Sequence, residues 1–229
     1  MAPSEAQLLI EKAGKVCWVA GADLTVWLRM NRRLADDPSL GNPADFFEFI
    51  SRTTFDSLAI RLRGLLKDDS ESGTVSIASV IGAVARGQLH LTRQRAVFDA
   101  APPGAYPQVI EAVNDRFSEL AKSGSVSEFP VAVAKLDLER CGRIVDPIRR
   151  FANDWVAHIK VAPQSSPPWL YHYMRAWSFS RRMIYKYEFL LRGSHLAFDP
   201  DGWLGLDWRR SFNKAWFPER TRGPLGTCQ

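Results

Sequence analysis

Residues 144–158, I-V-D-P-I-R-R-F-A-N-D-W-V-A-H, contain the pattern that most constrains the fold. Ile148, Phe151 and Trp155 recur at steps of three and four residues, the spacing of one face of an α-helix. His158 follows three residues later, so we expect it on the same buried or interfacial face. Such a histidine can be a core residue whose ring bonds a carbonyl, or it can carry chemistry, because its charge changes near neutral pH.

The remaining long segments have the same helical period, so the sequence predicts an all-α fold. No run of alternating Val, Ile and Thr bounded by turn residues indicates a strand. We expect one domain over residues 1–198, a bundle of about five to six helices. We expect an irregular C-terminal tail over residues 199–229, rich in Trp, Gly and Pro, to pack on that bundle. With 46% hydrophobic residues in 229, the chain can form a substantial core.

Capping and turn residues set the expected helix boundaries. Asn42 caps a helix with Pro43 at its first position. Ser125 and Glu128 have capping-box spacing in front of a helix that contains Pro147, which should kink that helix or restart it with Asp146 as the cap. The last helix should be capped by Ser166 and ended by Gly193. The second should end in the K-D-D-S-E-S-G stretch at residues 67–73. The expected helices span residues 4–34, 43 to this stretch, 76–98, 106–121, about 126–160, and 167–192.

The charges are distributed unevenly along the chain. Residues 140–229 hold 15 of the 30 Lys and Arg but only 7 of the 25 Asp and Glu. Aromatic residues are also concentrated in residues 140–229. Arginines beside Trp and Tyr suit phosphate contacts and base stacking. The alternative is a solvated helix face laid over an aromatic core. In the last helix, Trp169, Tyr173, Trp177 and Tyr187 have helical spacing, so we expect them in the core or a dimer interface rather than in a base-stacking platform.

Several functional classes lack support in the sequence. The three cysteines and four histidines show no metal-ligand spacing, and no phosphate-binding glycine motif or nucleophile elbow is present. Asp68, Asp69 and Glu71 are expected to be solvated loop carboxylates rather than metal ligands. We therefore expect no metal and no cofactor. The N-terminus does not resemble a secretory signal and no segment is apolar enough to cross a bilayer, so we expect a cytoplasmic protein without a membrane partner.

Two stretches resemble the HEPN superfamily, and more narrowly its AbiU-type abortive-infection branch. The first is F-D-S-L-A-I-R-L-R-G-L-L-K-D-D with the following V-S-I-A-S-V-I, within residues 55–81. The second is I-R-R-F-A-N-D-W-V-A-H-I-K, residues 148–160. The resemblance implies a helical-bundle homodimer active in phage defence or in a toxin–antitoxin pair, with RNA and an antitoxin or defence protein as partners.

The family resemblance also implies a set of site residues. In ribonuclease members, an arginine, a polar residue and a histidine of each protomer face one composite cleft, where the ribose 2′-hydroxyl attacks the adjacent phosphate without a metal. His158 matches the histidine, which can shuttle the proton, and Asp154 matches the polar residue. Arg149, Arg181, Arg182 and Lys160 are the expected RNA-binding cations.

The chain departs from the family pattern at the arginine. Asn153 occupies the usual arginine position, and the nearest arginine, Arg150, stands one helical turn earlier. An asparagine cannot replace a cation aimed at the transferring phosphate. Three hypotheses remain open: a metal-independent endoribonuclease that uses Arg150, a catalytically degenerate HEPN module that binds RNA, a nucleotide or a protein, and a structural bundle with His158 in its core.

Overall fold

The structure is a computed structural model, and it describes residues 1–36, 44–67, 75–101, 104–124, 126–157 and 166–193. The chain divides into two units, Met1–Leu196 and Ala197–Gln229, and all described residues belong to the first. The described part contains seven α-helices and one π-helical segment, with a single isolated bridge between Thr92 and Glu128. The all-α prediction is confirmed. The tail predicted over residues 199–229 lies outside the described residues, so the predicted division into domains stays a prediction.

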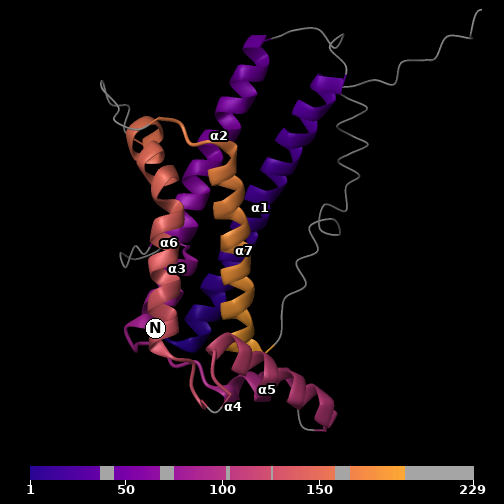
Figure 1. The fold of residues 1–229 in the computed structure, drawn as a ribbon, viewed down its shortest axis with the longest axis vertical. Coiled ribbons are helices and arrows are strands. Elements are labelled where there is room, and N and C mark those ends of the chain that lie inside the picture. Colours follow the sequence, from indigo (N-terminus) through magenta and orange to yellow (C-terminus); the bar gives the residue numbers. More distant parts are fainter. Residues whose placement is uncertain (37–43, 68–74, 102–103, 125, 158–165, 194–229) are drawn as a thin grey trace, which may run out of the picture. The chain divides into compact units, whose positions relative to one another are not determined.

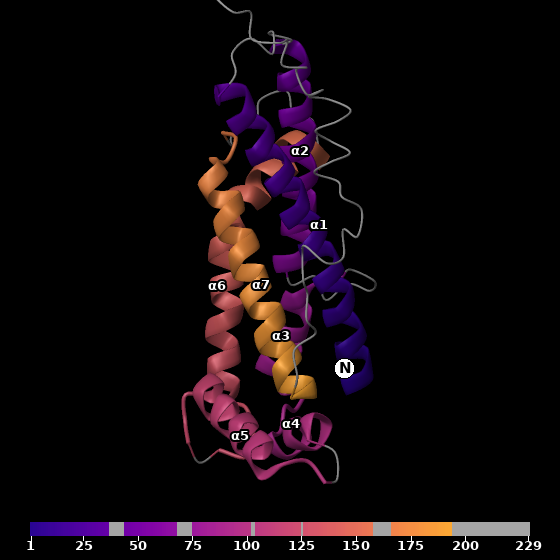
Figure 2. The same cartoon turned by 90° about the vertical axis from the view of Figure 1, so that its right-hand side faces the viewer.

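Four long helices lie side by side, as the two views in Figures 1 and 2 show. They are α1 (Pro3–Asp36), α2 (Ala44–Leu66), α6 (Val131–Phe151) and α7 (Leu170–Arg192). The short helix α3 (Ile77–Ala85) packs against α6 and α1, and all nine of its residues are buried. Helices α4 (Arg93–Ala100) and α5 (Pro107–Ala121) pack against each other at one end of the long helices (Figure 1).

Helical spacing of apolar residues explains the core. Helical spacing predicts a buried stripe of Phe46, Ile50, Leu58, Leu62 and Leu65 in α2. The three leucines are buried and Ile50 is half-buried, while the burial of Phe46 is not described. Asn42 and Pro43, the predicted start of this helix, lie outside the described residues. The stripe of α1 consists largely of small residues, which lets α7 approach closely. It contains Ala6, Ile10, Ala13, Cys17, Ala20, Gly21 and Leu24.

A tryptophan fixes the contact between α1 and α7. The indole Nε1 of Trp177 donates a hydrogen bond to the Cys17 carbonyl at 3.0 Å. A Cβ atom on Gly21 would lie 2.7 Å from the same indole, so this position requires glycine. Burial raises the pKa of the Cys17 thiol to about 12, so the thiol stays protonated and packs as a small apolar group.

The single helix predicted over residues 76–98 is wrong, because two helices occupy this region. Ser76 caps α3, its hydroxyl accepting from the Ser79 amide, and α3 ends at Ala85. Gly87 then adopts a φ of +68°, a left-handed conformation that glycine favours. A second helix, α4, starts after Thr92, whose hydroxyl accepts from the Arg95 amide.

The capping box predicted before α6 is also wrong. The helix begins at Val131 after Pro130, and the Glu128 carboxylate instead lies 2.5 Å from the His90 ring. Nor does the helix restart at Asp146, because α6 continues through Pro147 to Phe151. The carbonyl four residues before this proline belongs to Arg143, an exposed residue, so water can replace the lost hydrogen bond.

Helix α7 begins three residues later than predicted. Its N-cap is Trp169 rather than Ser166, and the Trp169 amide donates to Nδ1 of His172 at 3.1 Å. The predicted stop at Gly193 is confirmed, with a φ of +64° and a hydrogen bond from its amide to the Phe189 carbonyl. Among the described helices, none is long and apolar enough to span a membrane.

Candidate nucleic-acid interface

The end of α6 changes from an α-helix to a π-helical segment at Ala152–Ala157. This wider turn changes which side chains face the core. Ile148 and Phe151 are buried as predicted, but Trp155 is 43% exposed and Asp154 is only 8% exposed. The predicted burial of Trp155 is therefore wrong, because the α-helical spacing on which it rests ends at Phe151. His158 and Lys160 lie outside the described residues.

The two arginines before this segment bind one carboxylate. Arg149 and Arg150 each place a guanidinium nitrogen 2.5 Å from a different oxygen of Asp146. The hydrogen bond from Arg149, together with that from Arg150, holds the pKa of Asp146 below its ordinary value. Arg150 is 69% exposed, whereas Asp154 is buried, so these two predicted site residues differ in their access to solvent. Asn153, the third, is half-buried.

Arg149 also borders a groove between α6 and the end of α2. The groove has a volume of about 870 Å³ and combines apolar and charged side chains. It is lined by Leu66, Lys67, Leu138, Glu139, Gly142, Arg143, Val145, Asp146 and Arg149. Since Glu139 and Asp146 contribute acids to this groove, its charge is mixed.

Helix α7 has a very different surface. Its five basic residues are accompanied by one acid, Glu188, which is buried. Arg175, Arg181 and Arg182 are exposed, and no carboxylate of the described residues forms an ion pair with them. The surface charge of α7 in this structure is therefore entirely positive.

Aromatic rings accompany these arginines. The Arg181 guanidinium lies 5.3 Å from the ring centre of Trp177, and that of Arg175 lies 6.0 Å from the ring centre of Tyr171. Both distances allow cation–π attraction. Of the four aromatic residues predicted to be core or interface, Tyr173 and Tyr187 are buried and Trp177 is half-buried. Trp169 is 79% exposed, so a core position for it is wrong.

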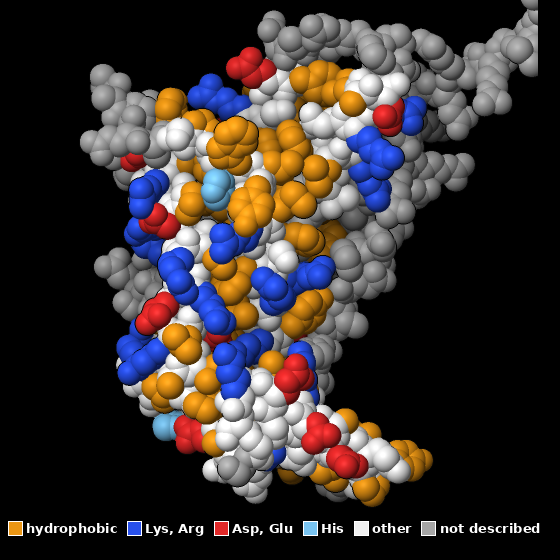
Figure 3. Space-filling view, in the orientation of Figure 1, with side chains coloured by type: hydrophobic (Ala, Val, Ile, Leu, Met, Phe, Trp, Pro, Cys, Tyr) orange, Lys and Arg blue, Asp and Glu red, His pale blue; other side chains and the backbone are white. Residues whose placement is uncertain are grey.

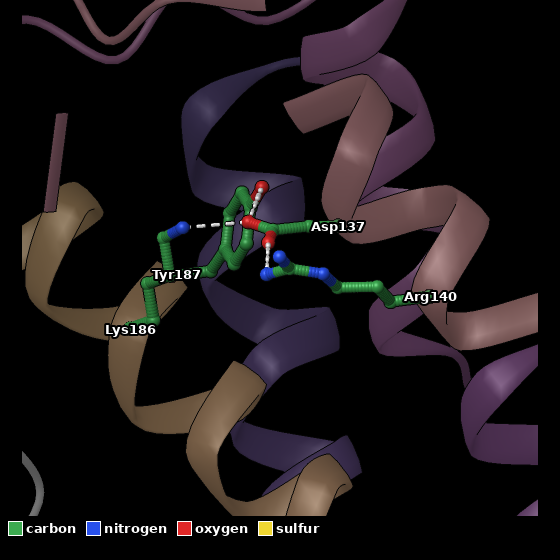
Figure 4. Close-up of polar contacts among 4 residues, drawn as sticks. All are labelled: Asp137, Arg140, Lys186 and Tyr187. Carbon is green, nitrogen blue, oxygen red and sulfur yellow. Dashed lines mark hydrogen bonds and ion pairs between the residues drawn. The ribbon is translucent and has the colours of Figure 1, made fainter. Parts of the chain in front are cut away.

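A buried charge cluster joins α6 to α7 (Figure 4). Asp137 is 2% exposed, and its Oδ2 accepts from Lys186 Nζ at 2.6 Å and from the Tyr187 hydroxyl at 3.1 Å. Arg140 lies 3.8 Å from Oδ1. Burial, with the Asp137 charge, raises the pKa of Tyr187, so the phenol stays protonated and donates. Lys186 also lies 5.0 Å from the ring centre of Phe129.

This cluster sets the register between the two helices. Because α6 and α7 are antiparallel and rise equally per residue, pairing Asp137 with Lys186 places Arg143 near the level of Arg181. Figure 3 shows Lys and Arg side chains gathered along the face of α6 and α7 turned toward the viewer. We define the basic face as Arg140, Arg143, Arg175, Arg181 and Arg182.

Sequence reasoning missed several of these residues. Asp146 was detectable, since it precedes Arg149 and Arg150 by three and four residues, the spacing of ion pairs on a helix. Arg140, Arg143 and Arg175 carry no local signal, because only the pairing of α6 with α7 makes the helices that carry them neighbours. Asp137 and Lys186 are 49 residues apart and equally invisible to local patterns.

Among the described residues, no three His, Cys, Asp or Glu side chains gather closely enough to hold a metal ion. Comparisons with models of protein families, with curated proteins and with solved structures found no match to this chain. The assignment of function therefore depends on the residues of the basic face and of the α6 terminus.

Proposed function

We propose that the protein binds RNA through the basic face, as an HEPN-like protein of prokaryotic phage defence or of a toxin–antitoxin pair. The observation that carries this proposal is the surface of α7, where Arg175, Arg181 and Arg182 have no acidic partner among the described residues. Unneutralised arginines attract phosphates, and binding releases the counterions condensed on the nucleic acid. The HEPN resemblance supports the choice of RNA and of a homodimer.

The local arrangement of arginines and aromatic rings suits the binding of phosphates. Arginine binds phosphate oxygens through two parallel N–H donors, and its planar group also stacks on aromatic rings. Arg175 and Arg181 already lie over the rings of Tyr171 and Trp177. These contacts restrict the two side chains before binding, so they lose less conformational entropy when a phosphate binds. Packing against α6 holds the helix that carries them, and the buried charge cluster fixes its register.

A charge-reversal experiment tests this proposal. RNA affinity of the double variant Arg181→Glu/Arg182→Glu is compared with that of Arg116→Glu/Lys122→Glu, which changes the net charge equally but on α5 and the residue that follows it. We expect the α7 variant to lose on the order of tenfold or more in affinity, because cations that contact phosphates become repulsive. Equal losses in both variants would instead indicate a response to net charge, without a defined site.

Metal-independent cleavage of RNA is the second candidate function. It is favoured by the π-helical segment that carries Asn153 and Asp154 immediately before His158, because such segments occur frequently at functional sites. In this proposal His158 moves the proton, while Arg150 leaves Asp146 to hold the phosphate as charge develops on it. No metal and no cofactor take part.

Incubation of the pure protein with bacterial RNA in EDTA tests cleavage. The active protein should leave ends with 2′,3′-cyclic phosphate, and His158→Ala, checked for folding by circular dichroism, should leave the RNA intact. Absence of cleavage by both folded proteins would exclude this second function. If the folded proteins bind RNA without cleaving it, a catalytically degenerate module is favoured. If they do not bind RNA either, a structural or protein-binding bundle is favoured.

A further inference from the structure

The start of α7 exposes two large aromatic side chains. Trp169 is 79% exposed and Tyr171 is 62% exposed, and Met174 on the following turn is 43% exposed. We define the aromatic platform as Trp169 and Tyr171. In Figure 3, hydrophobic side chains gather at the end of the bundle where α7 begins.

A third exposed ring lies near the same end. Trp155 of the π-helical segment is 43% exposed, and its ring stacks on Phe151 with 6.5 Å between the ring centres. The register set by Asp137 and Lys186 places Phe151, the last residue of α6, near the level of His172 in the first turn of α7, and Trp155 and Trp169 follow and precede these two residues in the chain. Exposed aromatic surface thus marks the end of both helices that form the basic face.

We propose that the aromatic platform stacks the bases of single-stranded RNA whose phosphates follow the arginines of α7. This inference rests on the proposed function and specifies the form of RNA that the basic face binds. A duplex keeps the faces of its bases inside the stack, so exposed rings gain nothing from it beyond contacts at its ends. A single strand offers unstacked bases, and stacking each one on an aromatic side chain contributes roughly 1–3 kcal/mol.

The order of side chains along α7 fits a strand that passes from ring to cation. Arg175 stands one turn after Tyr171 and lies over its ring at 6.0 Å, and Arg182 follows two turns later. Tyr171 and Arg182 are separated by about 16 Å of helix at 1.5 Å per residue. This length corresponds to about five phosphates in a stacked strand at roughly 3.4 Å each.

Two contacts hold the helix start and the Tyr171 ring before any ligand binds. The Trp169 amide donates to Nδ1 of His172, and the His172 ring meets Tyr171 edge-on at 5.7 Å between ring centres. Trp169 contributes only its backbone to the hydrogen bond. Its indole can therefore be replaced while the start of the helix is kept.

The experiment compares a double leucine variant of the platform with a single leucine variant elsewhere, on two probes. Fluorescence anisotropy measures binding of a ten-nucleotide single-stranded RNA that contains 2-aminopurine, and of a blunt ten-base-pair RNA duplex. Quenching of 2-aminopurine reports stacking directly. The variants are Trp169→Leu/Tyr171→Leu and, as control, Tyr106→Leu, whose tyrosine is 78% exposed at the start of α5.

We expect wild type to prefer the single strand and to quench 2-aminopurine. The platform variant should lose about tenfold or more in affinity for the single strand and lose the quenching, with little change on the duplex. The Tyr106 control should resemble wild type.

Other outcomes separate failure of this inference from failure of the proposed function. If the platform variant binds and quenches like wild type while Arg181→Glu/Arg182→Glu binds weakly, RNA binding stands and the platform is overturned. If wild type binds neither probe, both proposals fail. If the platform variant changes only a concentration-dependent self-association, the patch is a protein interface and the inference is overturned.

Discussion

The starts of α7 and α5 both expose an aromatic ring and apolar side chains, but in different electrostatic surroundings. On α7, Tyr171 is followed by arginines that have no carboxylate partner among the described residues. Next to α5, Tyr106 is 78% exposed, and the exposed charges that follow it are mainly acidic. The acids are Glu111, Asp115 and Glu119, and the bases are Lys122 and Arg116, which pairs with Glu119 at 2.5 Å.

The two helices also differ in their support. Helix α7 packs against α1, α2, α3, α4 and α6, whereas α5 packs mainly against α4. An exposed ring alone therefore does not indicate nucleic-acid binding. In our proposal, the combination of an exposed ring, arginines without an acidic partner among the described residues and a helix packed on five neighbours favours such binding, because stacking, phosphate attraction and a low ordering cost act together.

The largest difference between the two regions should lie in their ion pairs. We expect Asp137→Ala to lower the free energy of unfolding by about 3–5 kcal/mol, because it leaves the largely buried Lys186 ammonium without its carboxylate. Glu119→Ala, at the exposed pair on α5, should change it by less than about 1 kcal/mol. Urea denaturation of both variants measures the contrast. Similar small losses would show that the buried charge cluster does not hold α7 in place.

Next in size is the junction where α7 meets α4. A Cβ atom on Gly193 would lie 1.8 Å from the Ala96 carbonyl oxygen, and its φ is +64°. Gly193→Ala should therefore destabilise the protein by roughly 2–4 kcal/mol. Gly142→Ala, in α6, meets nothing within 4 Å and should stabilise it by roughly 0.5–1 kcal/mol. Thermal unfolding distinguishes the two, and a neutral effect at Gly193 would contradict this close contact between α7 and α4.

A smaller effect concerns the salt dependence of RNA binding. Removing two phosphate contacts from a single strand lowers the slope of log affinity against log salt concentration by about 1.4. We expect this change for Arg175→Gln/Arg182→Gln, measured by titrations between 50 and 200 mM salt. Arg116→Gln on α5 should leave the slope unchanged. Equal changes of the salt slope in both variants would contradict a phosphate-binding role specific to α7.

The smallest effect concerns Asp146 at the end of α6. Its carboxylate has a lowered pKa because Arg149 and Arg150 bind it, so its charge stabilises the fold above the unfolded pKa of about 3.9. This contribution is lost as pH falls through the folded pKa. Asp146→Asn should cost at most about 1 kcal/mol at pH 7, since both arginines are largely exposed, and nothing below the folded pKa. Urea unfolding at pH 7 and near pH 2.5 measures the difference, and an equal cost at both pH values would contradict it.

Local patterns predicted the secondary structure well where one period extends through a whole helix. The stripe of α2 and the stop at Gly193 are examples. They failed where the backbone changes state inside an apolar run. The break at Gly87 and the π-helical segment after Phe151 have no signature in the spacing of apolar residues, so the predicted long helix and the predicted burial of Trp155 were both wrong.

For the candidate site, the sequence alone determined the all-α class and the excess of Lys and Arg in its second half, because helical period and charge are local properties of the chain. It also supplied Arg149, Arg181 and Arg182 as cations that the structure places on the surface. The tertiary structure alone decided that Lys186 of α7 pairs with Asp137 of α6, and which aromatic rings reach solvent. Those properties depend on the packing of α6 against α7 through Asp137 and Lys186, a contact between residues far apart in the chain.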